Sequence, residues 1–229
     1  MNIALILSGG IGSRVGADIP KQYIKVNNQM IITYCIRTLS EHPMIDAIQI
    51  VADSQWKNDI IMDMQANGIE ADKIIGYSVP GKNRQLSICN GMADVKKAIG
   101  EDAVIFIHDA ARPRLTARQV TECINAMHGH DGVLPVLPMK DTVYMSSNGK
   151  TVTELLDRSR IYAGQSPEVF CMNKYMDANE RLMPNMIMNI NGSTEPAIMA
   201  GMDIAMIQGD EGNYKITTKE DLERFSQLI

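Results

Sequence analysis

The chain alternates short apolar runs with longer segments in which apolar residues recur every three or four positions. The short runs are rich in Ile and Val and end at Gly, Asp or Pro, which is typical of buried β-strands, whereas the recurring spacing is typical of helices. We predict strands at Ile3–Leu7, Ala47–Val51, Ala103–His108 and Gly132–Leu137, and helices at Ile31–Glu41, Gln55–Asn67, Arg84–Ile99 and Ala117–Met127. Because strand and helix alternate, the pattern predicts an α/β fold with a mostly parallel sheet covered on both faces.

After the last of these strands the pattern changes to two short segments with alternating polar residues, Asp141–Tyr144 and Thr151–Leu155. The Asn148-Gly149 pair between them is a strong signal for a hairpin turn. We therefore predict a projecting β-arm at about residues 139–156. Since an isolated two-stranded hairpin is marginally stable in water, the arm is expected to pack on another subunit or to fold back on its own.

The C-terminal part of the chain returns to the mixed pattern. An apolar segment at Ile161–Phe170 precedes a predicted helix at Asn173–Leu182, a strand near Ile204–Gln208 and a helix that begins at Thr218. The sequence shows no repeat, linker or low-complexity tract, so we expect residues 1–229 to form a single domain.

The composition excludes a disordered or collagen-like chain, since 45% of the 229 residues are hydrophobic and 21% are charged. The 22 basic residues are outnumbered by 27 acidic ones, which argues against a nucleic-acid partner. No apolar run approaches the roughly 18 residues of a membrane span, so no membrane partner is expected. The four cysteines are widely spaced and form no C-x-x-C motif, so the sequence favours a reduced, cytoplasmic protein.

A glycine-rich segment follows the first predicted strand directly and carries the first candidate chemistry. It reads Ser8-Gly9-Gly10-Ile11-Gly12-Ser13-Arg14 and is followed by Pro20-Lys21-Gln22. Glycines at such a turn expose backbone N–H groups, and Arg14 and Lys21 add positive charge, so the segment favours a nucleotide phosphate. The alternative is a glycine-rich surface turn with two solvated cations.

Two other nucleotide-binding patterns fit less well. Gly10, Gly12 and Gly16 are spaced one residue too widely for the G-x-G-x-x-G fingerprint of dinucleotide enzymes. The segment Gly76–Lys82 approaches the P-loop pattern, but Asn83 stands where that pattern requires a magnesium-binding hydroxyl. Neither a hydride-transfer enzyme nor a P-loop protein is therefore expected.

Five motifs, taken in order, resemble those of one family. They are Leu7–Arg14 with Pro20-Lys21-Gln22, His108–Pro113, Asp157-Arg158, Gln165-Ser166-Pro167 and Lys215-Ile216-Thr217. In order and spacing they are similar to the 2-C-methyl-D-erythritol 4-phosphate cytidylyltransferases and to the related ribitol-5-phosphate cytidylyltransferases, over nearly the whole chain. The resemblance implies a Rossmann-like nucleotidyltransferase fold, a homodimer built through an exchanged β-arm, and transfer of CMP from CTP to a polyol phosphate with release of pyrophosphate.

The resemblance also assigns roles to individual residues. The implied catalytic cations are Arg14, Lys21 and Lys215, and this suits a reaction that needs alignment and positive charge rather than a nucleophilic side chain. The implied nucleotide-binding residues are Ser8, Gly9, Gly10, Gly12, Gly81 and Ser87, the last two at the cytosine edge. The implied acceptor-binding residues are Asp109, Arg112, Thr142, Arg158, Ser166, Ser193 and Thr217.

Magnesium is the expected cofactor, since triphosphate chemistry usually needs a hard divalent ion held by phosphate oxygens with few protein ligands. Asp109, at the end of a predicted strand, is the best-placed carboxylate for it, unless it orients the polyol hydroxyls instead. The alternative interpretations are that Asp109 caps the following turn and that Arg158 forms a surface ion pair with Asp157 or Glu154. The histidines show no triad spacing, and we expect His108 to be a packed strand-end residue.

Several positions depart from the family pattern and leave the substrates open. Family members commonly have Gly at the position of Pro80 and a polar or acidic residue at that of Leu86, which bears on the preference for CTP. Thr194 replaces a usual Asp, so an erythritol-derived acceptor is only slightly favoured over ribitol phosphate. The alternatives are a sugar-phosphate nucleotidyltransferase that uses another nucleotide, and a nucleotide-binding protein without catalytic activity.

Overall fold

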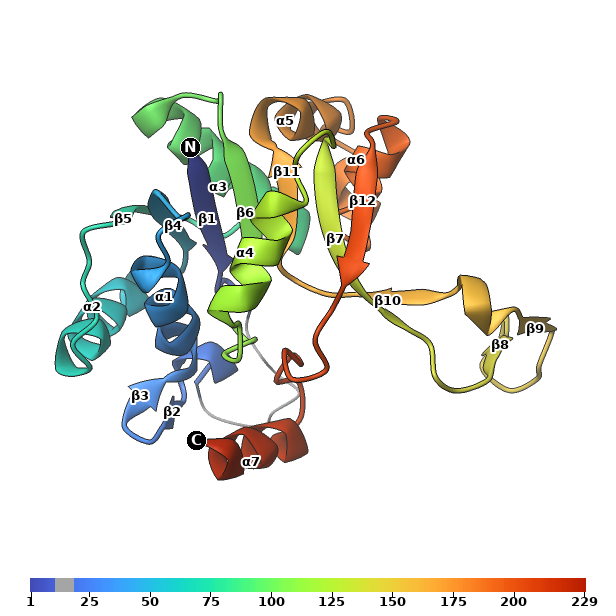
Figure 1. Cartoon of the computed structure of the whole chain (residues 1–229), viewed down its shortest axis with the longest axis horizontal. Helices are drawn as coiled ribbons and strands as arrows, with labels where there is room; N and C mark the ends of the chain where they lie inside the picture. Colours follow the sequence, from blue (N-terminus) through green and yellow to red (C-terminus); the bar gives the residue numbers. More distant parts are fainter. Residues whose placement is uncertain (11–18) are drawn as a thin grey trace.

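The computed structural model describes residues 1–10 and 19–229, which form a central sheet of eight strands (Figure 1). The strands are β1 (Asn2–Leu7), β4 (Ala47–Val51), β5 (Ile74–Ser78), β6 (Val104–Asp109), β7 (Gly132–Pro138), β10 (Tyr162–Gly164), β11 (Glu168–Cys171) and β12 (Ile204–Gln208). Along the sheet the order is β10-β7-β11-β6-β1-β4-β5, and β12 also pairs with β7.

Strand direction agrees with the predicted fold class. β1, β4, β5 and β6 are parallel, and so are β7 and β12. The prediction of an α/β fold with a mostly parallel sheet and flanking helices is therefore confirmed. The structure adds β10 and β11, which run antiparallel to their neighbours. After β7 the chain runs out into the arm and comes back as β10, which lies beside β7 and therefore runs in the opposite direction.

Helices cover both faces of this sheet. The helices on these faces are α1 (Ile31–Glu41), α2 (Lys57–Ala66), α3 (Arg84–Ile99), α4 (Ala117–Asn125), α5 (Met172–Glu180) and α6 (Glu195–Met199), whereas α7 (Lys219–Leu228) packs in a separate cluster with Val26 and Ile31. Side chains of α1, α2 and α4 share one core with Ala4 and Ile6 of β1, while those of α3, α5 and α6 share another with Ile3 and Leu5. Because successive strand residues point to opposite faces, the two cores lie on opposite sides of the sheet. Within the described residues, every helix is too short or too polar to cross a membrane.

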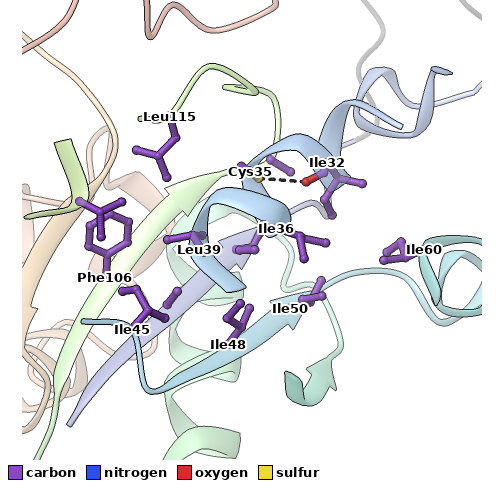
Figure 2. Close-up of a cluster of buried hydrophobic side chains, with 14 of the residues drawn as sticks. Ile32, Cys35, Ile36, Leu39, Ile45, Ile48, Ile50, Ile60, Phe106 and Leu115 are labelled. Atoms are coloured by element: carbon purple, nitrogen blue, oxygen red, sulfur yellow. Dashed lines mark hydrogen bonds between the residues drawn. The ribbon is translucent and has the colours of Figure 1, made fainter. Parts of the chain in front are cut away.

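Figure 2 shows the core beneath α1, where Ile36 and Leu39 pack in one cluster with Ile48 of β4. All three side chains are fully buried. The three- or four-residue spacing that predicts this helix presents one continuous apolar face to the strands. Burial also raises the pKa of Cys35 in this cluster to about 12, so its thiol stays protonated.

Local hydrogen bonds explain where the observed elements match or depart from the predicted ones. Helix α3 begins as predicted, because Oδ1 of Asn83 caps it by accepting from the N–H of Leu86 at 2.7 Å. The predicted helix at 55–67 instead divides into a 3-10 helix, η3 (Ser54–Trp56), and α2, since the side chain of Asp53 begins a separate turn. The edge strand β5 was not predicted, because Gly76 interrupts its apolar pattern and its burial is incomplete.

Short elements complete the described chain. They are the 3-10 helices η2 (Lys21–Tyr23), η4 (Arg158–Arg160) and η5 (Met186–Asn189), and the paired strands β2 (Lys25–Val26) and β3 (Gln29–Met30). Of these, η2 is the one that borders the site described below.

Strands β8 (Val143–Met145) and β9 (Glu154–Leu156) form a separate antiparallel pair that projects from the body of the molecule (Figure 1). The two strands are joined by a loop over residues 146–153 rather than by a tight hairpin turn. Oδ1 of Asn148 accepts from the N–H groups of Lys150 at 2.8 Å and Thr151 at 3.0 Å, while Gly149 adopts a φ of 69°. The Asn-Gly pair therefore does form a turn, but inside a wider loop.

Candidate functional site

A pocket of about 580 Å³ opens at the carboxyl ends of β1 and β6, where ligands of open α/β sheets gather. Leu7 and Asp109, the last residues of these strands, both line it. The predicted site residues that line the pocket are Gly9, Gly10, Lys21, Gly81, Ser87, Asp109 and Lys215. The structure thus brings predicted site residues from the beginning, middle and end of the chain together in one cavity. Gly12 and Arg14 lie outside the described residues.

The glycine-rich segment after β1 is held in place by η2. Nε2 of Gln22 donates to the carbonyl oxygens of Ser8 at 2.5 Å and of Gly10 at 2.7 Å. Ser8 itself is buried, and its hydroxyl donates to the carbonyl oxygen of Val51 at 2.8 Å. Lys21 belongs to the same short helix and lines the pocket, so one element both shapes the loop and supplies a cation.

The loop before α3 packs closely against the glycine-rich segment. A Cβ atom on Gly9 would lie 2.5 Å from the Cβ of Pro80, so only glycine fits there. A Cβ atom on Gly81 would likewise lie 2.5 Å from the Cβ of Leu86. Pro80 and Leu86, the two departures from the family pattern, therefore shape the pocket through contacts with glycines.

Gly81 and Ser87, the residues assigned to the cytosine edge, are bonded to each other. The N–H of Gly81 donates to the hydroxyl oxygen of Ser87 at 3.0 Å, and that hydroxyl donates to the carbonyl oxygen of Asn83 at 2.9 Å. These bonds fix the orientation of the Ser87 hydroxyl before any ligand is bound.

Asp109 lies at the centre of a charged cluster on the pocket wall. Its Oδ1 accepts from Nε and Nη2 of Arg84, at 3.2 and 3.0 Å. Its Oδ2 accepts from Nζ of Lys215 at 3.0 Å and lies 3.6 Å from Nε of Arg112. Burial alone would raise the pKa of Asp109, but the charges of Arg84, Lys215 and Arg112 outweigh it and hold that pKa far below its ordinary value. The carboxylate is therefore ionised at neutral pH.

The same contacts bear on the predicted magnesium site. Both oxygens of Asp109 already accept hydrogen bonds from cationic side chains. Among residues 1–10 and 19–229, no group of three or more His, Cys, Asp or Glu side chains is arranged to hold a metal ion. The described residues therefore offer no cluster of carboxylates for a protein-held ion, and Asp109 as a ligand of a phosphate-bound ion stays a prediction.

Behind the pocket, Ser166 and His108 fix the backbone that carries Asp109. The N–H of Asp109 donates to the hydroxyl oxygen of Ser166 at 2.9 Å, and that oxygen lies 3.0 Å from Nδ1 of His108. Nε2 of His108 lies 3.0 Å from the carbonyl oxygen of Arg112, which can only accept, so Nε2 carries the proton and Nδ1 accepts from Ser166. Burial lowers the pKa of His108 to about 4, which keeps the ring neutral. His108 is thus the packed strand-end residue that the sequence predicts.

Lys215 reaches the pocket on a segment that is tied to the loop after β6. Nη1 of Arg112 donates to the carbonyl oxygen of Asn213 at 2.6 Å. On the other side of Lys215, the N–H of Ile216 donates to the carbonyl oxygen of Ala111 at 2.9 Å. Contacts on both sides therefore set the path of the backbone that carries this lysine.

The remaining predicted acceptor-binding residues fall in two places. Thr217 lies beside the pocket, and its hydroxyl donates to the carbonyl oxygen of Lys215 at 3.1 Å. Thr142, just before β8, and Arg158, in η4 just after β9, are exposed and do not line the pocket of their own chain. Nη1 of Arg158 donates to the carbonyl oxygen of Lys140 at 2.7 Å, a backbone contact in place of the alternative ion pair.

Three residues that shape the site have no role assigned from the sequence: Gln22, described above, Arg84 and Glu168. Nη2 of Arg84 lies 3.1 Å from Oε2 of Glu168, and its Nη1 donates to the hydroxyl of Ser193. Ser193, a predicted acceptor-binding residue, is buried, and its hydroxyl donates to Glu168. One signal points to Arg84 in the sequence, since it is the first residue of a helix, where the helix dipole disfavours a cation.

Comparisons with known proteins show the family of the chain. Residues 2–229 match the IspD family, 2-C-methyl-D-erythritol 4-phosphate cytidylyltransferase. The chain is 32% identical to the enzyme of that name from Clostridioides difficile, over 100% of this chain and 94% of the relative. It is also 27% identical to ribitol-5-phosphate cytidylyltransferase from Lacticaseibacillus paracasei, over 100% of this chain and 98% of the relative.

The fold is also similar to a solved structure. The crystal structure of 2-C-methyl-D-erythritol 4-phosphate cytidylyltransferase from Francisella tularensis superposes with a TM-score of 0.82 at 24% identity, over 100% of this chain and 99% of that one. The likeness in structure supports the nucleotidyltransferase fold, and the family match spans residues 2–229. This protein therefore belongs to the 2-C-methyl-D-erythritol 4-phosphate cytidylyltransferase family of nucleotidyltransferases.

Proposed function

We propose that this chain transfers CMP from CTP to 2-C-methyl-D-erythritol 4-phosphate and releases pyrophosphate. The observation that carries the proposal is one pocket in which the glycine-rich segment after β1 meets the cations Lys21 and Lys215. In this reaction a phosphate oxygen of the acceptor bonds to the α-phosphorus of CTP, and the bond from that phosphorus to the departing pyrophosphate breaks. No side chain has to act as a nucleophile, so alignment and positive charge supply the catalysis.

The pocket residues divide between the phosphates and the base of CTP in this proposal. Lys21 and Lys215, together with Arg14 from the sequence analysis, stabilise the charge that grows on the phosphates. Gly9 and Gly10 let the triphosphate approach the backbone, because they place no side chain in its way. The fixed polar groups of the loop before α3 face the base, and selecting a base depends on such paired groups because a buried unpaired one is penalised.

The arm belongs to the proposal as the link between two copies of the chain. Its exposed apolar side chains include Tyr144, Val152 and Leu155, which are 58%, 65% and 62% exposed. Exposed apolar surface of this kind is typical of a site where a second protein surface binds, because binding removes the apolar side chains from water. In the proposed homodimer, the arm of one copy carries Thr142 and Arg158 to the acceptor end of the other copy's pocket.

Magnesium enters this proposal as a companion of CTP rather than as a resident ion of the protein. The described carboxylates form no cluster of three or more for a protein-held ion, whereas triphosphate oxygens are hard ligands of the kind that Mg²⁺ prefers. Its contribution when bound would be to neutralise phosphate charge. The cytoplasmic location expected from the cysteine pattern is likewise part of the proposal.

The test is an acceptor panel in which pyrophosphate release is followed with each nucleoside triphosphate in turn. We expect release to be fastest with CTP, magnesium and 2-C-methyl-D-erythritol 4-phosphate, and to stop when the metal is chelated. The second candidate function is transfer of CMP to ribitol 5-phosphate, and the similarity to the Lacticaseibacillus paracasei enzyme supports it. Faster pyrophosphate release with ribitol 5-phosphate would favour this second function. If CTP raised the melting temperature but no acceptor gave turnover, the chain would be a nucleotide-binding protein without this activity.

A further inference from the structure

Arg84 lines the pocket, yet the proposed reaction gives it no role. We propose that Arg84 is a positioning residue that fixes the carboxylate of Asp109 and, through it, the ammonium group of Lys215. This inference rests on the proposed function, in which Lys215 stabilises charge on the substrate.

The guanidinium group of Arg84 is committed to protein atoms. Its Nε and Nη2 both donate to Oδ1 of Asp109, at 3.2 and 3.0 Å, which leaves Oδ2 to accept from Nζ of Lys215 at 3.0 Å. Nη2 also donates to Oε2 of Glu168 at 3.1 Å, and Nη1 donates to the hydroxyl of Ser193. Most of the N–H donors of this side chain are thus used, so it holds protein groups rather than substrate.

The far side of Arg84 is anchored as firmly as the near side. The hydroxyl of Ser193 donates to Glu168, and the backbone carbonyl oxygen of Ser193 accepts from the hydroxyl of Tyr175 in α5 at 2.5 Å. Glu168 is the first residue of β11. A chain of contacts therefore runs from α5 and β11 through Arg84 to Asp109 and Lys215. Only a planar fork of donors reaches all three partners of Arg84 at once, which a lysine cannot do.

The place of Arg84 in the sequence supports this role. It is the first residue of α3, where the dipole of the helix disfavours a positive charge. A residue that contradicts its local preference is expected where tertiary contacts or function require it. Here the two carboxylates of Asp109 and Glu168 supply the compensation.

The test compares Arg84→Gln and Arg84→Lys with Arg118→Gln, a control at an exposed arginine of α4. We expect both Arg84 variants to lower kcat about 10²-fold, the cost of a small misplacement of a catalytic group, with the affinity for CTP close to that of the unchanged protein. Millimolar methylguanidinium should restore part of the turnover of Arg84→Ala, because the missing group opens onto the pocket. Methylguanidinium should not restore the turnover of Lys21→Ala, because that variant lacks the ammonium group of Lys21 and keeps the guanidinium group of Arg84.

A second variant guards against misfolding of the Arg84 variants. Glu168→Gln keeps the shape of the side chain and should lower kcat by a smaller factor, and it should have no further effect when combined with Arg84→Gln. If Arg84→Lys turned over at the normal rate, or if CTP affinity fell as much as kcat, the inference would be overturned. If the unchanged protein released no pyrophosphate, the proposed function itself would fail, so the two failures are distinguishable.

Discussion

In the pocket, Asp109 is held by Arg84 and Lys215, which lie 25 and 106 positions away in the sequence. In the arm, the carboxamide of Asn148 bonds to the N–H groups of residues two and three positions away. The pocket is therefore assembled by long-range contacts, whereas the bend of the arm is a local property of its turn residues. A motif search sees the second kind of feature directly and the first kind only through its consequences.

The two regions also differ in what remains unsatisfied. In the pocket, the buried carboxylate of Asp109 is compensated by cationic side chains of the same chain, so its negative charge is stabilised before a ligand binds. The arm leaves apolar side chains such as Leu155 exposed, so its surface calls for a second protein surface. Three experiments, ordered from the largest expected effect to the smallest, separate these two situations.

Lys21→Ala tests the pocket as a site of charge stabilisation. We expect turnover to fall by about 10²–10³ or more, because a preorganised charge beside the reacting phosphates is removed. Steady-state measurement of pyrophosphate release gives the answer, and circular dichroism checks that the variant is folded. Lys219→Ala is the matched control, since Lys219 is an exposed lysine of α7 whose pair with Glu223 contributes little. Near-normal turnover of Lys21→Ala would remove Lys21 from the catalytic set.

Deletion of residues 141–153 tests the arm as a link between two copies. We expect the shortened chain to have the mass of one copy by light scattering, with a raised KM for the acceptor and retained binding of CTP. The physical reason is that most of the exposed apolar surface of the arm, including Tyr144 and Val152, is lost while the pocket of the same chain is untouched. Lys150→Ala in the exposed loop of the arm should leave the mass of the intact assembly. A mass unaffected by the deletion would sever the arm from dimerisation.

Acid pH tests the buried wall behind the pocket. Burial lowers the pKa of His108 from about 6.5 to about 4, so at intermediate pH the unfolded chain binds a proton at this residue that the folded chain does not. The free energy of unfolding should therefore fall by about 2 kcal/mol between about pH 7 and about pH 5 from this residue. Burial lowers the pKa of His42 as well, which adds a loss of the same sign.

Urea unfolding at several pH values, carried out on the unchanged protein and on His108→Gln, isolates the contribution of His108. The variant should be less stable near neutral pH but should lose less stability on acidification. The arm-deleted chain should keep the full pH dependence, because His108 lies in the body of the protein. An identical slope in the unchanged protein and in His108→Gln would show that His108 does not titrate as proposed.

Much of the architecture follows from local patterns. The helices at Ile31–Glu41 and Arg84–Ile99 and the strands at Ala47–Val51 and Ile204–Gln208 occur at the predicted bounds, because apolar spacing specifies them locally. The direction of β11 and the existence of β5 depend on neighbouring strands, so a local pattern does not specify them. The Asn-Gly signal likewise located the turn of the arm but not the width of its loop.

The candidate site divides in the same way. Lys21, Lys215 and the glycines after β1 stand in ordered motifs, so the sequence alone marks them. Arg84 and Glu168 belong to none of the quoted motifs, and their partnership with Asp109 appears only in the folded chain. Ser166 and Ser193 are predicted acceptor contacts, and these contacts stay a prediction. In the folded chain both hydroxyls form hydrogen bonds within the protein.

The sequence by itself determined the alternation of elements, the family of the chain and the residue types available for phosphate chemistry. Those properties reside in short segments, where spacing and side-chain type act directly on the backbone. Tertiary structure alone decided which charges meet, because Arg84, Asp109 and Lys215 come together only when β6, α3 and the segment after β12 pack at one edge of the sheet. The state of Asp109 as an ionised carboxylate among cations is a property of that packing, since burial and opposite charge act through space rather than along the chain.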